Sequence, residues 1–248
     1  MRQATDIQVP AYWAWIIVLF QIVLPVSALI TIYILILGSA WEAEVSLGSL
    51  LAVILGILLA AIGLAVANSV LVYKLVGRRD GHFRRDFLLS DGMGDYLAAT
   101  SQATHIDLNV ERWTLITLHV SNPPQDRSPA LWALLTALII IIPIIGVVFL
   151  FYCLVFLTRD VHRHDERQRA MNLQFEKALL RAGKIGTLSD AWKPLPKRDV
   201  AVYVVLSILS LGLFLPYWWY VNIEDMNTHM KNQWEFENAL VEKLKAEV

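Results

Sequence analysis

Four long apolar runs alternate with polar stretches along the chain. The runs cover residues 11–37, 45–76, 130–157 and 200–221. A helix of about 20 apolar residues spans the hydrocarbon core of a bilayer, and every run reaches that length. The pattern therefore predicts an all-α integral membrane protein with about four hydrophobic helical segments, which makes the lipid bilayer its first partner.

Two of these runs carry helix-breaking residues well inside them. Pro143 and Gly146 lie near the middle of the third run, and Gly212 and Pro216 lie in the second half of the fourth. Proline removes a helical hydrogen bond and clashes with the preceding turn. We therefore expect one or both runs to form re-entrant hairpins, which enter and leave the membrane on the same side.

The positions of the basic residues bear on topology. The stretch after the second run opens with Arg78, Arg79, Arg84 and Arg85, and residues 159–198 contain ten Lys and Arg residues. Because Lys and Arg favour the cytoplasmic side, both stretches should lie there. Plain alternation of four spans would place residues 159–198 outside, whereas hairpins keep them and the C-terminus cytoplasmic. Both topologies stay open on the sequence alone.

The second half of the chain contains an internal repeat. Five residues recur with an offset of 65 as Phe149/Phe214, Tyr152/Tyr217, Asp160/Asp225, His164/His229 and Gln168/Gln233. A fainter echo, Arg79-Asp80-Gly81-His82 against Arg159-Asp160-Val161-His162, carries no weight alone.

The repeat suggests a division of the chain. Two membrane spans in 1–76 and a cytoplasmic loop at 77–129 precede a first unit at 130–182. A linker at 183–198 then leads to a second unit at 199–248. Each unit is a membrane segment followed by an amphipathic cytoplasmic helix.

The second unit carries the motif Leu211-Gly212-Leu213-Phe214-Leu215-Pro216-Tyr217-Trp218-Trp219-Tyr220, followed by Glu224, Asp225 and Asn227. It resembles an uncharacterised prokaryotic membrane-domain family, whose hallmark is a Leu-Gly turn, a Tyr/Trp-rich exit and a polar helix. The earlier Ile145-Gly146 and Tyr152 look like a degraded copy. The resemblance covers roughly residues 130–240 and implies no activity.

The repeat places two Asp/His pairs at helical i, i+4 spacing. Asp160 with His164 and Asp225 with His229 could supply four ligands to a divalent metal such as zinc. The competing interpretation is structural, since an aspartate at a membrane exit commonly caps a helix or pairs with a neighbouring arginine. The structural interpretation predicts that Asp160 and Asp225 tether their helices.

Composition narrows the choice of function. A net charge of −1 gives no basic excess for nucleic acid, and Cys153, the single cysteine, allows no internal disulfide. Recognised catalytic or cofactor motifs are missing from the sequence.

We therefore expect a non-catalytic, multi-pass protein of the plasma membrane. It would be an accessory, assembly or scaffold subunit whose amphipathic helices contact another membrane-protein subunit or a second copy. A small transporter or channel and a metal-dependent membrane enzyme are the alternatives.

Overall fold

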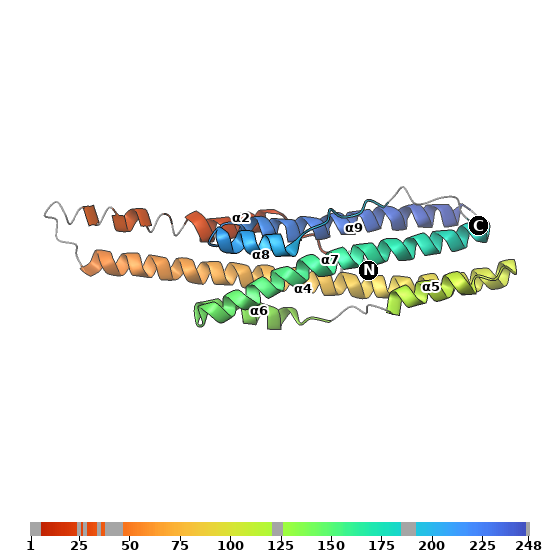
Figure 1. Cartoon of the computed structure of the whole chain (residues 1–248), viewed down its shortest axis with the longest axis horizontal. Coiled ribbons are helices and arrows are strands. Elements are labelled where there is room, and N and C mark those ends of the chain that lie inside the picture. The colour runs from red at the N-terminus through yellow and green to blue at the C-terminus, as the bar shows by residue number, and fades with distance from the viewer. Residues whose placement is uncertain are drawn as a thin grey trace.

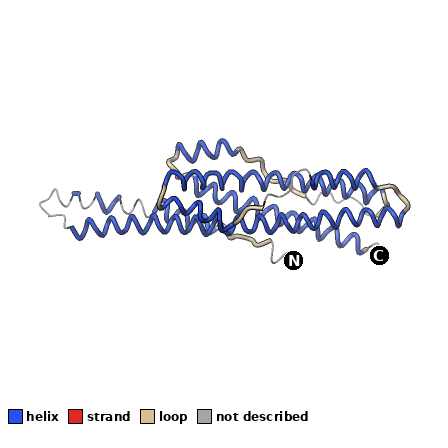
Figure 2. The backbone as a smooth tube through the Cα atoms, turned by 90° about the horizontal axis from the view of Figure 1, so that it is seen from below, coloured by secondary structure: helices blue, strands red, loops and turns tan. Residues whose placement is uncertain are grey.

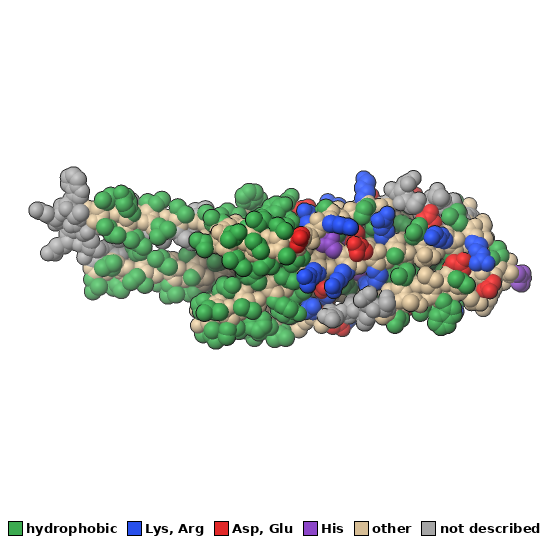
Figure 3. Space-filling model, viewed as in Figure 1, with side chains coloured by type: hydrophobic (Ala, Val, Ile, Leu, Met, Phe, Trp, Pro, Cys, Tyr) green, Lys and Arg blue, Asp and Glu red, His purple; other side chains and the backbone are tan. Residues whose placement is uncertain are grey.

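The computed structural model describes residues 6–23, 47–120, 126–184 and 192–246, with isolated positions between 26 and 37. All regular structure in these ranges is helical. The helices form an elongated bundle, shown in Figure 1. Apolar side chains cover one half of the visible face and charged side chains gather on the other (Figure 3). We call these the apolar half and the polar half.

The first apolar run begins as α2 (Tyr12–Val18), which continues into the π-helix η1 (Leu19–Val23). Much of its remainder, and nearly all of the acidic link to the second run, lies outside the described residues. The segment before α2 packs into the bundle, because Val9 is buried and its carbonyl accepts a hydrogen bond from the side chain of Asn227.

The second run belongs to a single helix, α4 (Leu47–Thr104), of 58 residues. At 1.5 Å per residue its length is about 87 Å. Residues 77–104, expected as part of a loop, instead continue this helix. The sequence contains no proline between residues 77 and 122, and α4 buries polar side chains such as His82 and Asp86 against the bundle.

Helix α5 (Asn109–Val120) follows a short turn at the far end of the polar half (Figure 1). The Asp107 carboxylate accepts a hydrogen bond from the Asn109 amide, which caps the helix start. Residues 109–120, expected as part of the same loop, are therefore helical as well.

The third run folds as a helical hairpin. Helix α6 (Pro129–Ala137) and the 3-10 turn η2 (Leu138–Ile140) lead into α7 (Pro143–Arg181). Pro143 opens α7, and the Gly146 amide bonds to the Ile142 carbonyl. The break predicted at Pro143 and Gly146 is therefore the point where the chain reverses.

The fourth run reverses in the same way. Helix α8 (Val200–Leu209) is separated from α9 (Leu215–Lys245) by a turn in which Leu211 and Gly212 have positive φ angles of 52° and 90°. The Tyr203 ring on α8 contacts Phe214, Tyr217 and Trp218, which hold the two arms together. Helix α4 extends beyond both hairpin tips (Figures 1 and 2).

The two repeat units are therefore two helical hairpins whose long arms, α7 and α9, run into the polar half. Among the described helices, α4 and α7 are long and apolar enough to cross a membrane. The apolar helices α6 and α8 are shorter arms, so the expectation of about four hydrophobic membrane segments is met only in part.

The aromatic exit of α9 divides between the core and the surface. Trp218 and Trp219 are fully buried, whereas Tyr217 and Tyr220 are exposed. The indole of Trp219 donates to the side-chain oxygen of Asn68 at 3.0 Å, and that of Trp218 donates to Thr158 at 2.9 Å. These bonds join α9 to α4 and α7 at the border between the two halves.

Candidate metal centre

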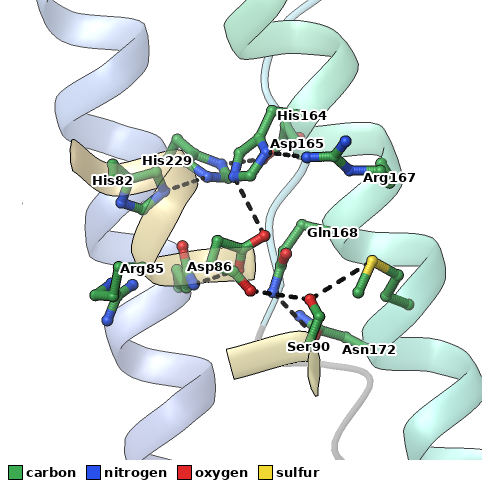
Figure 4. A network of polar contacts seen from close by, with 12 residues as sticks. His82, Arg85, Asp86, Ser90, His164, Asp165, Arg167, Gln168, Asn172 and His229 are labelled. Carbon is green, nitrogen blue, oxygen red and sulfur yellow. Dashed lines mark hydrogen bonds and ion pairs between the residues drawn. The ribbon is translucent and has the colours of Figure 1, made fainter. Parts of the chain in front are cut away.

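Three histidines meet inside the polar half, one from each long helix. His82 lies on α4, His164 on α7 and His229 on α9 (Figure 4). Their ring centroids are 5.0 to 5.4 Å apart. One nitrogen of each ring lies within 4.8 Å of those of the other two, and each residue is at most 2% exposed.

Carboxylates orient two of these rings. His82 Nδ1 lies 2.9 Å from Asp6, and His229 Nδ1 lies 2.8 Å from Asp165. Because an ionised carboxylate only accepts hydrogen bonds, both Nδ1 atoms carry the proton in the neutral rings. Each Nε2 atom is then left with a lone pair, and these two Nε2 atoms lie 3.1 Å apart.

The third ring is held differently. The Arg167 guanidinium donates to His164 Nδ1 at 2.8 Å. His164 Nε2 is buried without a hydrogen-bond partner, and the nearest carboxylate oxygen, on Asp86, is 3.6 Å away. The hydrogen-bonding capacity of His164 Nε2 is therefore also unmet.

A shell of polar groups fixes the two orienting carboxylates. Asp6 accepts a hydrogen bond of 2.6 Å from the Trp234 indole and pairs with Arg85 at 3.1 Å. Asp165 accepts from the Leu195 amide at 3.1 Å. The shell therefore draws on the N-terminal segment and on the stretch before α8, as well as on the long helices.

Burial sets the protonation of the centre. It lowers the pKa of His82 to about 4 and that of His164 well below its usual value, because desolvation disfavours the charged ring. Burial would raise the pKa of Asp6, but its hydrogen bonds to His82 and Trp234 bring it down to about 2. Near pH 7 His82 and His164 are therefore neutral, as metal coordination requires, and Asp6 is ionised.

The structure brings together two of the four residues that the sequence put forward as ligands. His164 and His229 join the cluster, while the two aspartates form ion pairs elsewhere. Asp160 pairs with Arg79 at 2.6 Å, and Asp225 pairs with Arg198 at 2.9 Å. Both aspartates tether their helices, as the structural interpretation predicts.

His82 was not among the candidate ligands. The faint echo between residues 79–82 and 159–162 aligns His82 with His162, which pairs with Asp225 outside the cluster, so it did not identify His82 as a ligand. His82 and His229 are 147 positions apart in the sequence, so no local spacing could have predicted their contact.

Comparisons with known proteins add no assignment to this geometry. No protein-family model, curated protein or solved structure matches the chain. The resemblance of residues 130–240 to a membrane-domain family stays a prediction.

Proposed function

We propose that the chain is a non-catalytic integral protein of the plasma membrane. Its apolar half lies in the bilayer, its polar half and C-terminus lie in the cytoplasm, and it serves as an accessory, assembly or scaffold subunit. The supporting observation is the exposed apolar surface that covers one half of the visible face of the bundle and stops where the charges begin (Figure 3).

Exposed apolar residues lie along α4 and at both hairpin tips. On the first turns of α4, Leu47 is 73% exposed and Ile54 is 60% exposed. At the tips, Ile144 and Leu211 reach 81% and 93%. A soluble protein rarely leaves so large an apolar surface in water, whereas lipid accommodates it.

The lengths of the hairpin arms fit a re-entrant insertion. Helix α6 with η2 comprises 12 residues, and α8 comprises 10. They extend about 15 to 19 Å, roughly half of a 30 Å hydrocarbon core. The side chain of Gln21 donates a hydrogen bond to the Gly212 carbonyl. The hydrocarbon of a bilayer offers no hydrogen-bond donor, so the Gly212 carbonyl needs a donor from the protein.

The apolar stripes of the amphipathic helices α7 and α9, expected to contact a partner, are instead buried within the bundle, as at Met171 and Met230. An exposed surface for a partner lies on α5, at the far end of the polar half. On α5, Val110 is 71% exposed and Trp113 is 67% exposed, although both face water. Exposed aromatic and aliphatic side chains of this kind are typical anchors of protein interfaces. We propose that α5 contacts another membrane-protein subunit or a second copy of the chain.

Site-specific photo-crosslinking in native membranes tests this function. A photoreactive residue at Trp113 should give one defined adduct, and Val110→Lys should abolish it by placing a charge in the interface. The same probe at Leu173, an exposed residue of α7, is the matched control and should give no such adduct. A monomer in mild detergent, with no adduct from Trp113 in membranes, would contradict the proposal.

Transport is the second candidate function, because hairpins that end at mid-depth resemble the discontinuous helices of transporters. The polar side chains Gln21, Asn68 and Thr158 in or beside the apolar half already bond within the protein. Those bonds favour the scaffold. Ion or solute flux into liposomes that carry the purified protein, above that of empty liposomes, would instead support transport.

A further inference from the structure

We propose that His82, His164 and His229 bind one divalent transition-metal ion, of the zinc class, which ties α4, α7 and α9 together. This inference goes beyond the scaffold function and does not depend on it. A metal bound by these residues would stabilise the packing of the polar half, independently of any partner that α5 contacts.

The first argument is the approach of two lone pairs. His82 Nε2 and His229 Nε2 lie 3.1 Å apart, and both Nδ1 protons are committed to carboxylates. Two facing lone pairs repel unless a cation lies between them. Zinc–nitrogen bonds of 2.0 to 2.1 Å at a tetrahedral angle place two nitrogens about 3.3 to 3.4 Å apart, close to the observed distance.

The second argument is the arrangement of the orienting groups. Metal-binding histidines nearly always donate their other N–H to a carboxylate or carbonyl, which fixes the tautomer and raises ligand basicity. Asp6 and Asp165 hold His82 and His229 in this way, and both carboxylates are themselves anchored. They also supply negative charge that offsets a buried dication.

The third ligand is His164, whose buried Nε2 atom lacks a hydrogen-bond partner. Coordination through Nε2 requires the proton to sit on Nδ1, where Arg167 now donates. Arg167 must therefore turn away on metal binding, and its partly exposed side chain can move toward the Asp86 carboxylate that attracts it. Asp86 or a water molecule would complete four-fold coordination.

The ligand set indicates the class of metal. Imidazole nitrogens suit zinc, cobalt, nickel or copper, whereas magnesium and calcium prefer oxygen ligands. The three histidines are almost inaccessible to solvent, so a substrate could not reach the ion. A closed site of this kind is typical of a structural metal, which agrees with a non-catalytic protein.

A shared proton is the competing explanation. One additional proton between His82 and His229 would turn the facing lone pairs into an N–H···N hydrogen bond. An additional buried positive charge is costly to desolvate, whereas a metal brings its own ligand bonds to compensate for desolvation. The two explanations differ in metal content, which can be measured.

The experiment uses the full chain, purified in mild detergent and stripped of metal with a chelator. Titration with Co²⁺ should give one equivalent of binding and the intense visible absorption of a tetrahedral nitrogen site. Zn²⁺ should displace the Co²⁺ and raise the melting temperature. His82→Gln and His229→Gln should lose the absorption, while His162→Gln, on the same helix as His164, should retain it.

Two further variants keep the test decisive if the histidine variants fail to fold. Asp165→Asn should weaken Co²⁺ binding by about 10- to 100-fold. Arg167→Gln should strengthen Co²⁺ binding, because the glutamine side-chain oxygen can accept a hydrogen bond from Nδ1–H of His164. Absence of stoichiometric binding by the wild-type chain, or equal binding by the wild type and His229→Gln, would overturn the metal site and leave the shared proton.

Discussion

Gly146 packs against the backbone of Ile139, so closely that a Cβ atom on the glycine would lie 2.1 Å from the Ile139 nitrogen. The two arms of the first hairpin therefore meet backbone to backbone, as small residues allow between membrane helices. A larger residue at position 146 would separate η2 from α7.

We therefore expect Gly146→Ala to destabilise the fold by about 1 to 3 kcal/mol, the usual cost of overpacking a well-packed contact. Thermal unfolding in detergent measures this loss. Gly56→Ala is the matched control, because a Cβ atom there meets nothing within 4 Å. Equal stability of both variants would show that the arms do not pack as described.

The bond between Trp219 and Asn68 supplies a second prediction. Trp219→Phe removes the indole N–H and leaves a buried amide oxygen unsatisfied, at a cost of about 1 to 3 kcal/mol. Asn68→Leu should recover part of this loss in the double variant, since the orphaned acceptor is then gone. Tyr217→Phe, at a half-exposed position, should change little. Additive effects of Trp219→Phe and Asn68→Leu would contradict a direct bond.

The third prediction concerns the pH dependence of the ion pair between Asp225 and Arg198. Burial alone would raise the pKa of Asp225, but hydrogen bonds from His162 and Arg198 bring it below its usual value of 3.8. A carboxyl whose folded-state pKa is lowered stabilises the protein above about pH 4, and this contribution fades as pH falls through the lowered pKa.

Asp225→Asn should therefore destabilise the protein by about 1 to 3 kcal/mol at pH 7, and the difference from wild type should shrink below about pH 4. Denaturation curves at several pH values measure it. Metal content should be unchanged, in contrast to His229→Gln, because Asp225 lies in an ion pair outside the histidine cluster. Loss of metal in Asp225→Asn would return this aspartate to the ligand set.

The fourth prediction concerns topology. Lys184, at the end of α7, should lie on the same side of the membrane as the arginines of residues 78–85, because both hairpins return the chain to the polar half (Figure 1). Cysteine variants of Lys184 and of Glu42, which lies outside the described residues, can be labelled with an impermeant reagent. The native Cys153 is buried and should give little background.

In intact cells we expect label at position 42 alone, and label at position 184 only after the membrane is opened. Labelling of both positions in intact cells would exclude the re-entrant arrangement and favour plain alternation of four spans.

Local signals predicted the hairpins and two of the three clustered histidines. Pro143 and Gly146 interrupt an apolar run too abruptly for a straight helix, and the repeat paired His164 with His229. Helical periodicity and helix-breaking residues act over a few positions, which a single sequence shows directly.

Long-range partners could not be predicted in this way. Asp6 contacts His82 across 76 positions and Trp234 across 228. The continuation of α4 beyond residue 77 depends equally on tertiary packing, because polar residues that look like a loop are buried against α7 and α9. Asp160 and Asp225 were considered as ligands because local sequence spacing does not show that Arg79 and Arg198, from other segments, pair with them.

The unbroken course of α4 has a mechanical consequence. One helix begins in the apolar half and ends beside α5, so on the proposed membrane placement it would link the bilayer to the surface that carries Val110 and Trp113. With about 43 Å of helix on each side of its midpoint, a tilt of about 10° would displace the distal end by about 8 Å. Helices tilt to match the thickness of their bilayer, so on the proposed placement a thinner or thicker membrane would tilt the bundle as one body and reposition the exposed face of α5.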